Sequence, residues 1–250
     1  MHLILTMAGK GSRFSKVGYT TPKFLLKIGD DIVLNKVLLS FDLEQFESIT
    51  FICLQEHLHT FKLHEIIYKL TLPHPNINIV SIDKVTNGQA ETASIFLKKN
   101  FLENIVIFNV DSFYSEKILL DNMFIDNFAG SIQVFNSICG DQYSFVLPSS
   151  KSAGLNNIIA IEEKVKISNY ASTGLYLFKN SEVFCKGFEG VLKKVKLGFF
   201  SETFVSLIYK ELLEMGYKIS GFETNASTFH VVGTPNEYKK YCNKIELLKS

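Results

Sequence analysis

Short apolar runs alternate with helical patterns through the first 110 residues, and this alternation limits the possible folds more than any other feature. The predicted strands are His2–Met7, Ser48–Leu54, Asn78–Ile82 and Ile105–Val110, and the predicted helices are Val33–Gln45, Glu56–Leu70 and Gln89–Lys99. Strands joined through crossover helices pair in parallel, and the helices cover both faces of the sheet. The order β-α-β-α-β-α-β therefore predicts an α/β fold with a doubly wound, mostly parallel, Rossmann-like sheet.

The second half of the chain is richer in strands, which indicates a mixed sheet there. Its predicted strands are Ser131–Phe135, Tyr143–Leu147, Asn157–Glu163, Gly174–Phe178, Lys218–Glu223 and Phe229–Val232, and its predicted helices are Ser181–Lys194 and Glu202–Met215. A last helix begins where Thr234 caps it, Pro235 takes the first turn and Glu237 completes a capping box. The sequence contains no evident linker. It therefore predicts one domain over residues 1–250, with a parallel half (1–130) and a mixed half (131–250).

Composition excludes several classes of protein. The 26 basic and 25 acidic residues leave a net charge of +1, so no overall field favours a nucleic acid or a membrane. The apolar stretch at the N-terminus ends at Lys10, which is too short for a signal peptide or a membrane span. The four cysteines are isolated and predict reduced thiols in a cytoplasmic protein; they are Cys53, Cys139, Cys185 and Cys242.

A loop rich in glycine and basic residues follows the first predicted strand. It reads Met7-Ala8-Gly9-Lys10-Gly11-Ser12-Arg13, and Pro22-Lys23 comes ten residues after the arginine. Glycines let the backbone turn sharply and bring its N–H groups close to an anion. Lys10, Arg13 and Lys23 would add three cations around that anion. The loop therefore predicts a polyphosphate site, against the alternative of an ordinary strand-to-helix loop.

Two well-known glycine motifs are absent from the sequence. The dinucleotide-binding motif needs a third glycine where Phe14 stands, and the P-loop string does not occur. The combination of Ala-Gly-x-Gly-Ser-Arg with a downstream Pro-Lys instead resembles the sugar nucleotidyltransferase family, whose members join a nucleoside triphosphate to a phosphorylated sugar or alcohol. The resemblance implies a nucleotidyltransferase fold and catalytic roles for Lys10, Arg13 and Lys23. It also implies that residues 7–13 and Lys23 bind the nucleotide. By the same resemblance, residues 1–130 would be mainly the nucleotide-binding half and residues 131–250 mainly the acceptor-binding half.

A second motif begins the third predicted helix. Gly88 would allow a flat ring to approach closely, and Gln89 can donate to and accept from one edge of a pyrimidine. The family has a glycine and a polar residue at this place that contact the base. The structural alternative is a plain helix start capped by Asn87, and both interpretations can hold together.

Asp111 follows the strand expected at the centre of the sheet. Ligands of open α/β sheets bind at the carboxyl ends of the strands, so an aspartate there is well placed to hold Mg²⁺ on a triphosphate. The family has an aspartate at this place, and the resemblance implies that Asp111 is both a nucleotide-binding residue and the metal ligand. The structural alternative is an aspartate that caps the next turn.

A fourth motif lies in the mixed half. Glu163-Lys164 and the later Thr173-Gly174 resemble segments with which the family holds its acceptor. By that resemblance Lys164 would contact the acceptor phosphate, Glu163 its hydroxyls, and Thr173 and Gly174 would line the pocket. The family commonly has proline after Glu-Lys, and this chain has Val165. A solvated charged edge is the alternative.

The fifth match contains a departure. The segment from His230 to Pro235 resembles the family's closing Asp-x-Gly-Thr-Pro, but Val231 occupies the aspartate position. Many members use that aspartate as a second Mg²⁺ ligand, and valine cannot coordinate a metal. Either Asp111, the phosphates and water hold the ion, or another group helps. His230 is adjacent, but neighbouring residues of a strand face opposite ways.

Together these motifs predict a Mg²⁺-dependent nucleotidyltransferase that releases pyrophosphate. The chain is most similar to short bacterial cytidylyltransferases of surface polysaccharides, which implies CTP, a phosphorylated sugar, polyol or small alcohol, and a role in capsule synthesis. A homodimer is compatible with the resemblance. UTP or dTTP with a hexose 1-phosphate is the alternative, and a sugar 1-phosphate is itself in question because of Val231. A glycosyltransferase would usually show Asp-x-Asp where Asn109-Val110-Asp111 stands. A non-catalytic nucleotide sensor is a further alternative, and Val231 is the only residue that favours it.

Overall fold

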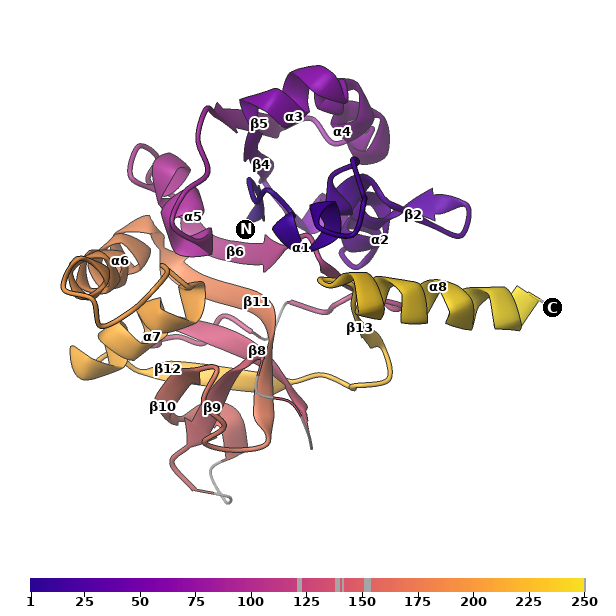
Figure 1. Cartoon of the computed structure of the whole chain (residues 1–250). Coiled ribbons are helices and arrows are strands. Elements are labelled where there is room, and N and C mark those ends of the chain that lie inside the picture. Colours follow the sequence, from indigo (N-terminus) through magenta and orange to yellow (C-terminus); the bar gives the residue numbers. More distant parts are fainter. Residues whose placement is uncertain (121–122, 138–139, 141, 151–153, 250) are drawn as a thin grey trace.

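A single large β-sheet organises the chain. The computed structural model describes residues 1–120, 123–137, 140, 142–150 and 154–249, so Cys139 lies outside the described residues. The strands of this sheet are β1 (His2–Met7), β4 (Ser48–Leu54), β5 (Ile77–Ile82), β6 (Glu103–Asn109), β8 (Gly130–Asn136), β9 (Ser144–Pro148), β10 (Ile158–Glu163), β11 (Tyr170–Asn180) and β12 (Ile219–Glu223). Their order in space is β5-β4-β1-β6-β11-β8-β12-β10-β9 (Figure 1).

Strands β1, β4, β5 and β6 form the parallel, doubly wound part that the sequence predicts. β1 pairs in parallel with β4 on one side and with β6 on the other. The chain therefore leaves β1 toward β4 and later returns to its opposite side, which makes β1 and β6 the switch point of the sheet. Ligands of such sheets bind at the carboxyl ends of the two switch-point strands.

The other strands make the sheet mixed. β11 is antiparallel to both β6 and β8, and β12 is parallel to β8. β9 pairs with β10 and also returns to the start of β11, so this end of the sheet curls on itself. The fold class is thus confirmed. Both hydrophobic cores contain residues from before and after position 130.

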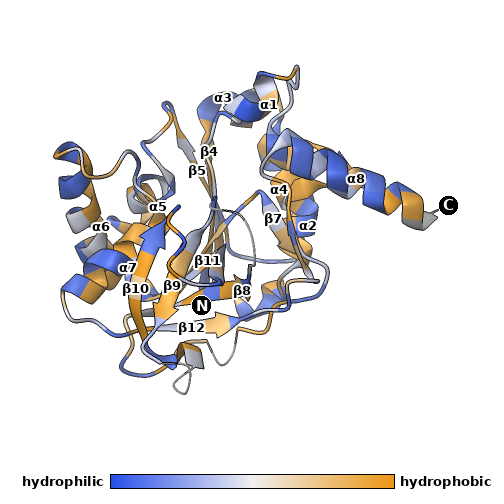
Figure 2. Cartoon of the chain, turned by 60° about the horizontal axis from the view of Figure 1, so that its bottom comes forward, coloured by the Kyte–Doolittle hydropathy of each residue, from blue (hydrophilic) through white to orange (hydrophobic). Residues whose placement is uncertain are grey.

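Helices pack on both faces of the sheet. They are α1 (Ser12–Ser15), α2 (Val33–Leu39), α3 (Gln55–Thr60), α4 (Leu63–Thr71), α5 (Gln89–Leu97), α6 (Ser181–Lys196), α7 (Val205–Glu214) and α8 (Pro235–Lys249). One core gathers α2 and α4 against the sheet, and the other gathers α5, α6 and α7 (Figure 1). Figure 2 shows apolar strands in the interior and polar faces on the outer helices. Among the described helices, none has the length and apolar character needed to cross a membrane.

Two predicted helices are wrong in extent. The helix expected over Val33–Gln45 ends at Leu39, and the Oγ of the next residue, Ser40, accepts a hydrogen bond from the Tyr114 amide at 2.8 Å. Only a short 3-10 turn at Leu43–Gln45 follows. The helix expected over Glu56–Leu70 is two helices, since Lys62 adopts a left-handed φ of 47° between them.

Three short strands lie outside the main sheet and were not predicted. β7 (Ser112–Tyr114) pairs antiparallel with β13 (Phe229–Val231), whose position the sequence did indicate. β2 (Lys27–Ile28) and β3 (Asp31–Ile32) form a small hairpin. Strands as short as β2, β3 and β7 carry too little alternation to be recognised reliably from a sequence.

Candidate active site

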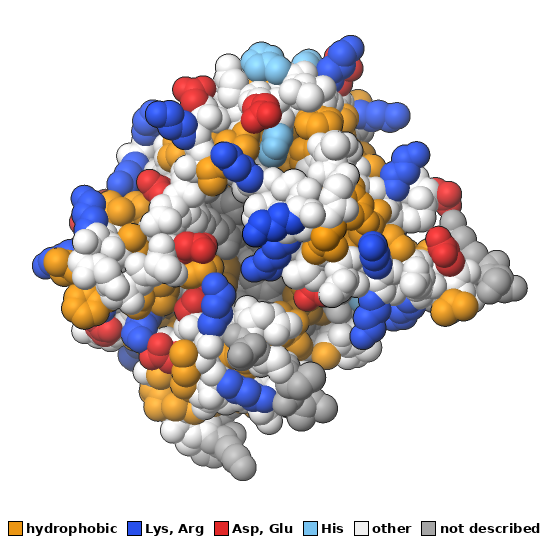
Figure 3. All heavy atoms as spheres, in the orientation of Figure 1, with side chains coloured by type: hydrophobic (Ala, Val, Ile, Leu, Met, Phe, Trp, Pro, Cys, Tyr) orange, Lys and Arg blue, Asp and Glu red, His pale blue; other side chains and the backbone are white. Residues whose placement is uncertain are grey.

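A cavity of about 750 Å³ lies where the sheet's switch point predicts it. Figure 3 shows the hollow, with charged side chains of both signs beside it. Residues of both halves line it; those with a predicted role are Met7, Ala8, Gly9, Arg13, Lys23, Gly88, Gln89, Asp111, Glu163, Lys164, Thr173 and Gly174. Lys10, Gly11 and Ser12 have predicted roles but lie outside the lining, and the Lys10 side chain is exposed. One cavity therefore brings together residues predicted to bind two different substrates.

Lys23 and Asp111 meet in this cavity although 88 residues separate them. The Lys23 ammonium donates to Asp111 Oδ2 at 2.6 Å, and both side chains are about one quarter exposed (25% and 23%). Lys23 begins a 3-10 turn, Lys23–Leu25, whose Phe24 is buried in the core. The turn is therefore anchored, and the ammonium is held at the carboxyl end of β6.

The segment that carries Val231 wraps around Asp111. The amide of Val232 donates to the backbone carbonyl of Asp111 at 2.8 Å. A Cβ at Gly233 would lie 3.1 Å from Asp111 Oδ2, so a larger residue would crowd this side of the carboxylate. Val231 lines the cavity. The position at which the family has its second aspartate thus lies at the site, where this chain presents an apolar side chain.

His230 faces away from Asp111, as the alternation of a strand predicts. Its ring packs against Phe113 and Tyr241, with centroid distances of 5.4 Å and 4.9 Å. Burial, together with the nearby Lys244, lowers the pKa of His230 below its ordinary value. His230 therefore belongs to the packing of α8 and does not replace the missing carboxylate.

The glycine loop between β1 and α1 borders open space. Within the described residues, a Cβ at Gly9 or Gly11 would contact nothing within 4 Å. Gly11 has a φ of 62°, in the left-handed region that favours glycine, and its carbonyl accepts from the Phe14 amide at 2.8 Å. Phe14 is buried and packs edge-on against Tyr19 and Tyr238, at 5.4 Å and 6.1 Å between ring centroids. An anchored loop thus leaves its backbone accessible.

Gly88 has a structural reason to be glycine that the sequence did not reveal. Its φ is 130°, and a Cβ there would lie 2.6 Å from the carbonyl oxygen of Thr203. Thr203 also caps α5, since its carbonyl accepts from the Ala90 amide at 2.9 Å and its Oγ1 from the Glu91 amide at 3.2 Å. The expectation that Asn87 caps this helix is wrong. A residue 115 positions downstream of Gly88 does so.

Glu163 and Lys164 differ in their surroundings. The Glu163 carboxylate is mostly buried and accepts hydrogen bonds from Ser144 Oγ and, at 2.8 Å, from Ser206 Oγ. Lys164 has a left-handed φ of 57° and is half exposed, with its ammonium 4.2 Å from the centroid of the Phe204 ring. Glu163 is thus held rigidly, whereas Lys164 extends over an aromatic face at the cavity.

Thr173 lines the cavity with its hydroxyl already engaged. Thr173 Oγ1 donates to Gln133 Oε1 at 3.0 Å, and Gln133 also accepts from the Tyr114 hydroxyl. Behind it, burial is the main cause that raises the pKa of Tyr176 to about 12, so this phenol stays neutral at ordinary pH. The hydroxyls of Thr173 and Tyr176 therefore add polar but uncharged groups to the cavity lining.

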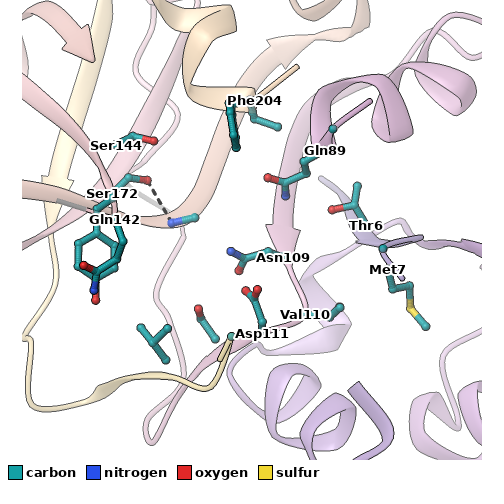
Figure 4. Close-up of a pocket in the computed structure, with 18 of the residues that line it drawn as sticks. Thr6, Met7, Gln89, Asn109, Val110, Asp111, Gln142, Ser144, Ser172 and Phe204 are labelled. Carbon is teal, nitrogen blue, oxygen red and sulfur yellow. Dashed lines mark hydrogen bonds between the residues drawn. The ribbon is translucent and has the colours of Figure 1, made fainter. Parts of the chain in front are cut away.

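Sequence reasoning missed several residues of the cavity. Those with polar or aromatic side chains include Thr6, Asn109, Gln142, Ser144, Ser172, Tyr176 and Phe204. In Figure 4 the side chains of Gln89, Asn109, Asp111 and Phe204 point toward the same open space. Thr6 Oγ1, Gln89 Nε2 and Asn109 Oδ1 are buried and have no hydrogen-bond partner among the described residues. A polar residue that ends a run of apolar strand residues, as at Thr6 and Asn109, was the available signal.

Fold and cavity together define a class, that of Rossmann-like α/β proteins with a cavity lined by charged residues at the switch point of the sheet. The model of the nucleotidyl transferase family matches residues 2–246, and the chain belongs to this family. It is thus a member of a family of enzymes that transfer nucleotidyl groups. No curated protein matches the sequence significantly.

Three solved structures resemble the whole chain. A nucleoside-diphosphate-sugar pyrophosphorylase from Vibrio cholerae RC9 is 26% identical, with a TM-score of 0.85 over 97% of this chain and 100% of its own. The inositol-1-phosphate CTP transferase of T. maritima is 16% identical, with a TM-score of 0.74 over 98% and 96%. A putative glucose-1-phosphate thymidylyltransferase from Bacillus anthracis is 20% identical, with a TM-score of 0.74 over 97% and 94%. The last two likenesses concern the fold alone.

Proposed function

We propose that this protein joins CTP to a phosphorylated sugar, polyol or small alcohol and releases pyrophosphate. The observation that carries the proposal is the shared cavity, which is lined by Arg13, Lys23 and Asp111 from residues 1–130 and by Glu163 and Lys164 from residues 131–250. The family supports a nucleoside triphosphate and a sugar phosphate as the two substrates. Cations from both parts of the chain in one cavity suit a reaction between two phosphorylated molecules.

The chemistry follows from charge. An oxygen of the acceptor phosphate attacks the α-phosphorus, a new P–O bond forms, and the bond to the bridging oxygen of the β-phosphate breaks. The acceptor phosphate is already an anion near neutral pH, so no general base is required. The barrier comes from repulsion between two polyanions and from the charge that develops on the leaving pyrophosphate. Catalysis then consists of positioning and electrostatic stabilisation.

The cations of the nucleotide half have separate roles in this proposal. Lys23 contacts the α-phosphate, because it is held at the carboxyl end of β6 beside Asp111. Arg13 and Lys10 neutralise the β- and γ-phosphates. The exposure of Lys10 means that it reaches only a phosphate near the mouth of the cavity.

Mg²⁺ fits the site with Asp111 as its protein ligand. A carboxylate oxygen is a donor that Mg²⁺ prefers, and Mg²⁺ on nucleotides commonly takes its other ligands from phosphates and water. The described residues contain no cluster of three His, Cys, Asp or Glu side chains that could hold a metal, so the fit depends on the triphosphate. When bound, the ion offsets phosphate charge. Because Val231 has no oxygen to offer, Asp111 would be the carboxylate that the protein supplies to the ion.

Gln89 supports a pyrimidine nucleotide. Its amide nitrogen is buried, unpartnered among the described residues and directed at the cavity (Figure 4). An amide N–H donates readily to a carbonyl such as O2 of cytosine, which uracil and thymine also carry. CTP is our choice because of the resemblance to short cytidylyltransferases of surface polysaccharides, and a capsule precursor is the product class that this implies. UTP or dTTP with a hexose 1-phosphate is the alternative.

A substrate screen tests the proposal. Each of the four common nucleoside triphosphates, and dTTP, is combined with inositol 1-phosphate, glucose 1-phosphate and glycerol phosphate, and pyrophosphate release is measured with and without Mg²⁺. We expect release with CTP and one acceptor, and only with Mg²⁺. Binding of a nucleotide without release from any pair would indicate a sensor instead. Consumption of ready-made nucleotide sugars alone would indicate a glycosyltransferase.

A further inference from the structure

Thr6 and Asn109 form a polar floor for the cavity. They are register partners on the parallel strands β1 and β6, so their side chains leave the sheet on the same face. Thr6 Oγ1 and Asn109 Oδ1 are both buried without a hydrogen-bond partner in the described part of the chain. Buried polar oxygens are normally satisfied, and two neighbours that both lack a partner indicate a group that arrives with a ligand.

Gly174 leaves the space that the side-chain amide of Asn109 occupies. It lies on β11, which flanks β6 on the side away from β1. A Cβ at Gly174 would lie 2.5 Å from Asn109 Nδ2 and 3.0 Å from Asn109 Oδ1. Any larger residue would displace the amide, and the φ of 86° at Gly174 also favours glycine. Gly174 was predicted to line the pocket, and the structure shows that the residue it makes room for is Asn109, which was not predicted.

A hydroxyl suits this floor better than a phosphate does. An amide oxygen only accepts hydrogen bonds, whereas the threonine hydroxyl can donate or accept. A phosphate oxygen near neutral pH has no proton to donate and would be repelled by Asn109 Oδ1. A hydroxyl can donate to Asn109 Oδ1 and accept from Thr6 Oγ1 at the same time, which satisfies both atoms.

We propose that Thr6 and Asn109 form a subsite for a sugar hydroxyl of the substrate, an inference that rests on the proposed function. Two sources share this chemistry. Thr6 directly precedes the loop Met7–Arg13, and Gln89 points into the same space (Figure 4), so a ribose between base and phosphates is one source. Gly174 borders the subsite on the acceptor side, so a ring hydroxyl of the acceptor is the other.

The first test compares nucleotide binding. Asn109→Leu preserves side-chain size and removes the acceptor oxygen, and calorimetry with Mg²⁺ measures the affinity for CTP, 2′-deoxy-CTP and 3′-deoxy-CTP. If ribose is the source, Asn109→Leu weakens CTP binding about tenfold, and the analogue that lacks the bound hydroxyl binds both proteins equally. Thr6→Val, which is also close in size, weakens CTP binding in the same direction. The matched control is Asn78→Leu, because Asn78 lies on β5 outside the cavity lining and donates to Thr50 Oγ1 at 3.3 Å.

The second test concerns the acceptor. If the acceptor is the source, CTP affinity is unchanged in Asn109→Leu, and the KM for the acceptor found in the substrate screen rises about tenfold relative to Asn78→Leu. Removal of an unsatisfied oxygen also raises the melting temperature of the ligand-free Asn109→Leu protein above that of the wild type. Asn109→Leu with wild-type CTP affinity, and with a wild-type KM or no acceptor at all, overturns the subsite. Absence of pyrophosphate release alone overturns only the proposed function, since the CTP comparison remains readable, and absence of any nucleotide binding overturns both.

Discussion

Asp111 and Lys23 neutralise each other when the substrates are absent, because the ammonium donates to the carboxylate at 2.6 Å. In the proposed reaction each of them needs a different partner, Mg²⁺ for Asp111 and phosphate for Lys23. A metal ion alone must compete with the ammonium, and a triphosphate alone must compete with the carboxylate. We therefore expect the metal and the nucleotide to bind cooperatively, and each to strengthen the other by the same factor.

Asp111→Asn should bind nucleotide more tightly than the wild type when Mg²⁺ is removed by a chelator. The substitution frees Lys23 and removes a negative charge that repels phosphate. A partly exposed pair of this kind is worth about 1 kcal/mol, so we expect about a fivefold gain in affinity for metal-free CTP, measured by calorimetry. Asp42→Asn, which breaks the exposed pair of Asp42 with Lys117, is the control. Weaker binding of metal-free CTP by Asp111→Asn would contradict the coupling.

Lys23→Ala should slow turnover by two to three orders of magnitude. One donor that stabilises transition-state charge is worth about 3–4 kcal/mol. The turnover number is measured with the substrate pair found by the screen, and circular dichroism verifies folding. Lys69→Ala, on the exposed surface of α4 and outside the cavity lining, is the control. An unchanged turnover number in folded Lys23→Ala protein would remove Lys23 from the mechanism.

Individual site residues could be predicted where they belong to a local sequence motif. Lys23 and Asp111 could both be named because each lies at a recognisable position after a glycine loop or a buried strand. Their direct pairing was not foreseen, since it depends on how residues far apart in sequence meet. The sequence analysis assigned no role to Thr6, and it considered Asn109 only as the counterpart of the first aspartate of an Asp-x-Asp motif. What marks them is the lack of partners, which appears only in three dimensions.

At the scale of elements, the junction between α5 and the Thr203 segment offers the sharpest test. Gly88→Ala should lower the free energy of unfolding by about 3 kcal/mol, because the new methyl group overlaps the backbone of Thr203 at a φ that alanine rarely adopts. Gly198→Ala is the matched control. Gly198 also has a positive φ, of 80°, but no described atom would meet its Cβ within 4 Å, so we expect a loss of about 1 kcal/mol. Urea denaturation measures both, and equal losses would contradict the overlap.

Element boundaries followed the sequence best inside the sheet. β1 and β4 have the predicted bounds, because strands buried on both faces are continuous apolar runs between polar residues. The capping box of α8 was also predicted. In the structure the Thr234 amide donates to Glu237 Oε2 at 2.8 Å, and the Glu237 amide donates to Thr234 Oγ1 at 3.3 Å. Helix ends were less predictable, since α2 stops where Ser40 bonds to β7 and α5 is capped by Thr203. Those ends are set by distant partners that no local pattern encodes.

At the scale of the whole molecule, buried tyrosines limit the alkaline range of stability. Burial raises the pKa values of Tyr114, Tyr176 and Tyr209, and that of Tyr176 reaches about 12. Above pH ~10 the unfolded chain loses its tyrosine hydroxyl protons more readily than the folded chain does. The contribution of these tyrosines to the free energy of unfolding is therefore fully present below pH ~10 and falls as the pH rises toward 12.

Tyr176→Phe should make that alkaline fall less steep. The variant lacks one of the protons involved, so the slope of unfolding free energy against pH should decrease by about 1.4 kcal/mol per pH unit between pH ~10 and 12. Denaturant titrations at several pH values measure the slope. Tyr68→Phe is the control, because the Tyr68 side chain is half exposed. The same slope in Tyr176→Phe and the wild type would refute the assignment.

The aromatic contact of Phe14 and Tyr19 with Tyr238 has a consequence for how the protein is made. Tyr19 and Tyr238 lie 6.0 Å apart between ring centroids, and the Tyr238 hydroxyl also donates to the Lys27 carbonyl at 2.6 Å. The glycine loop is translated more than two hundred residues before the ring that supports its anchor. In a nascent chain the loop therefore lacks this aromatic support until α8 has been translated and has docked against Phe14 and Tyr19.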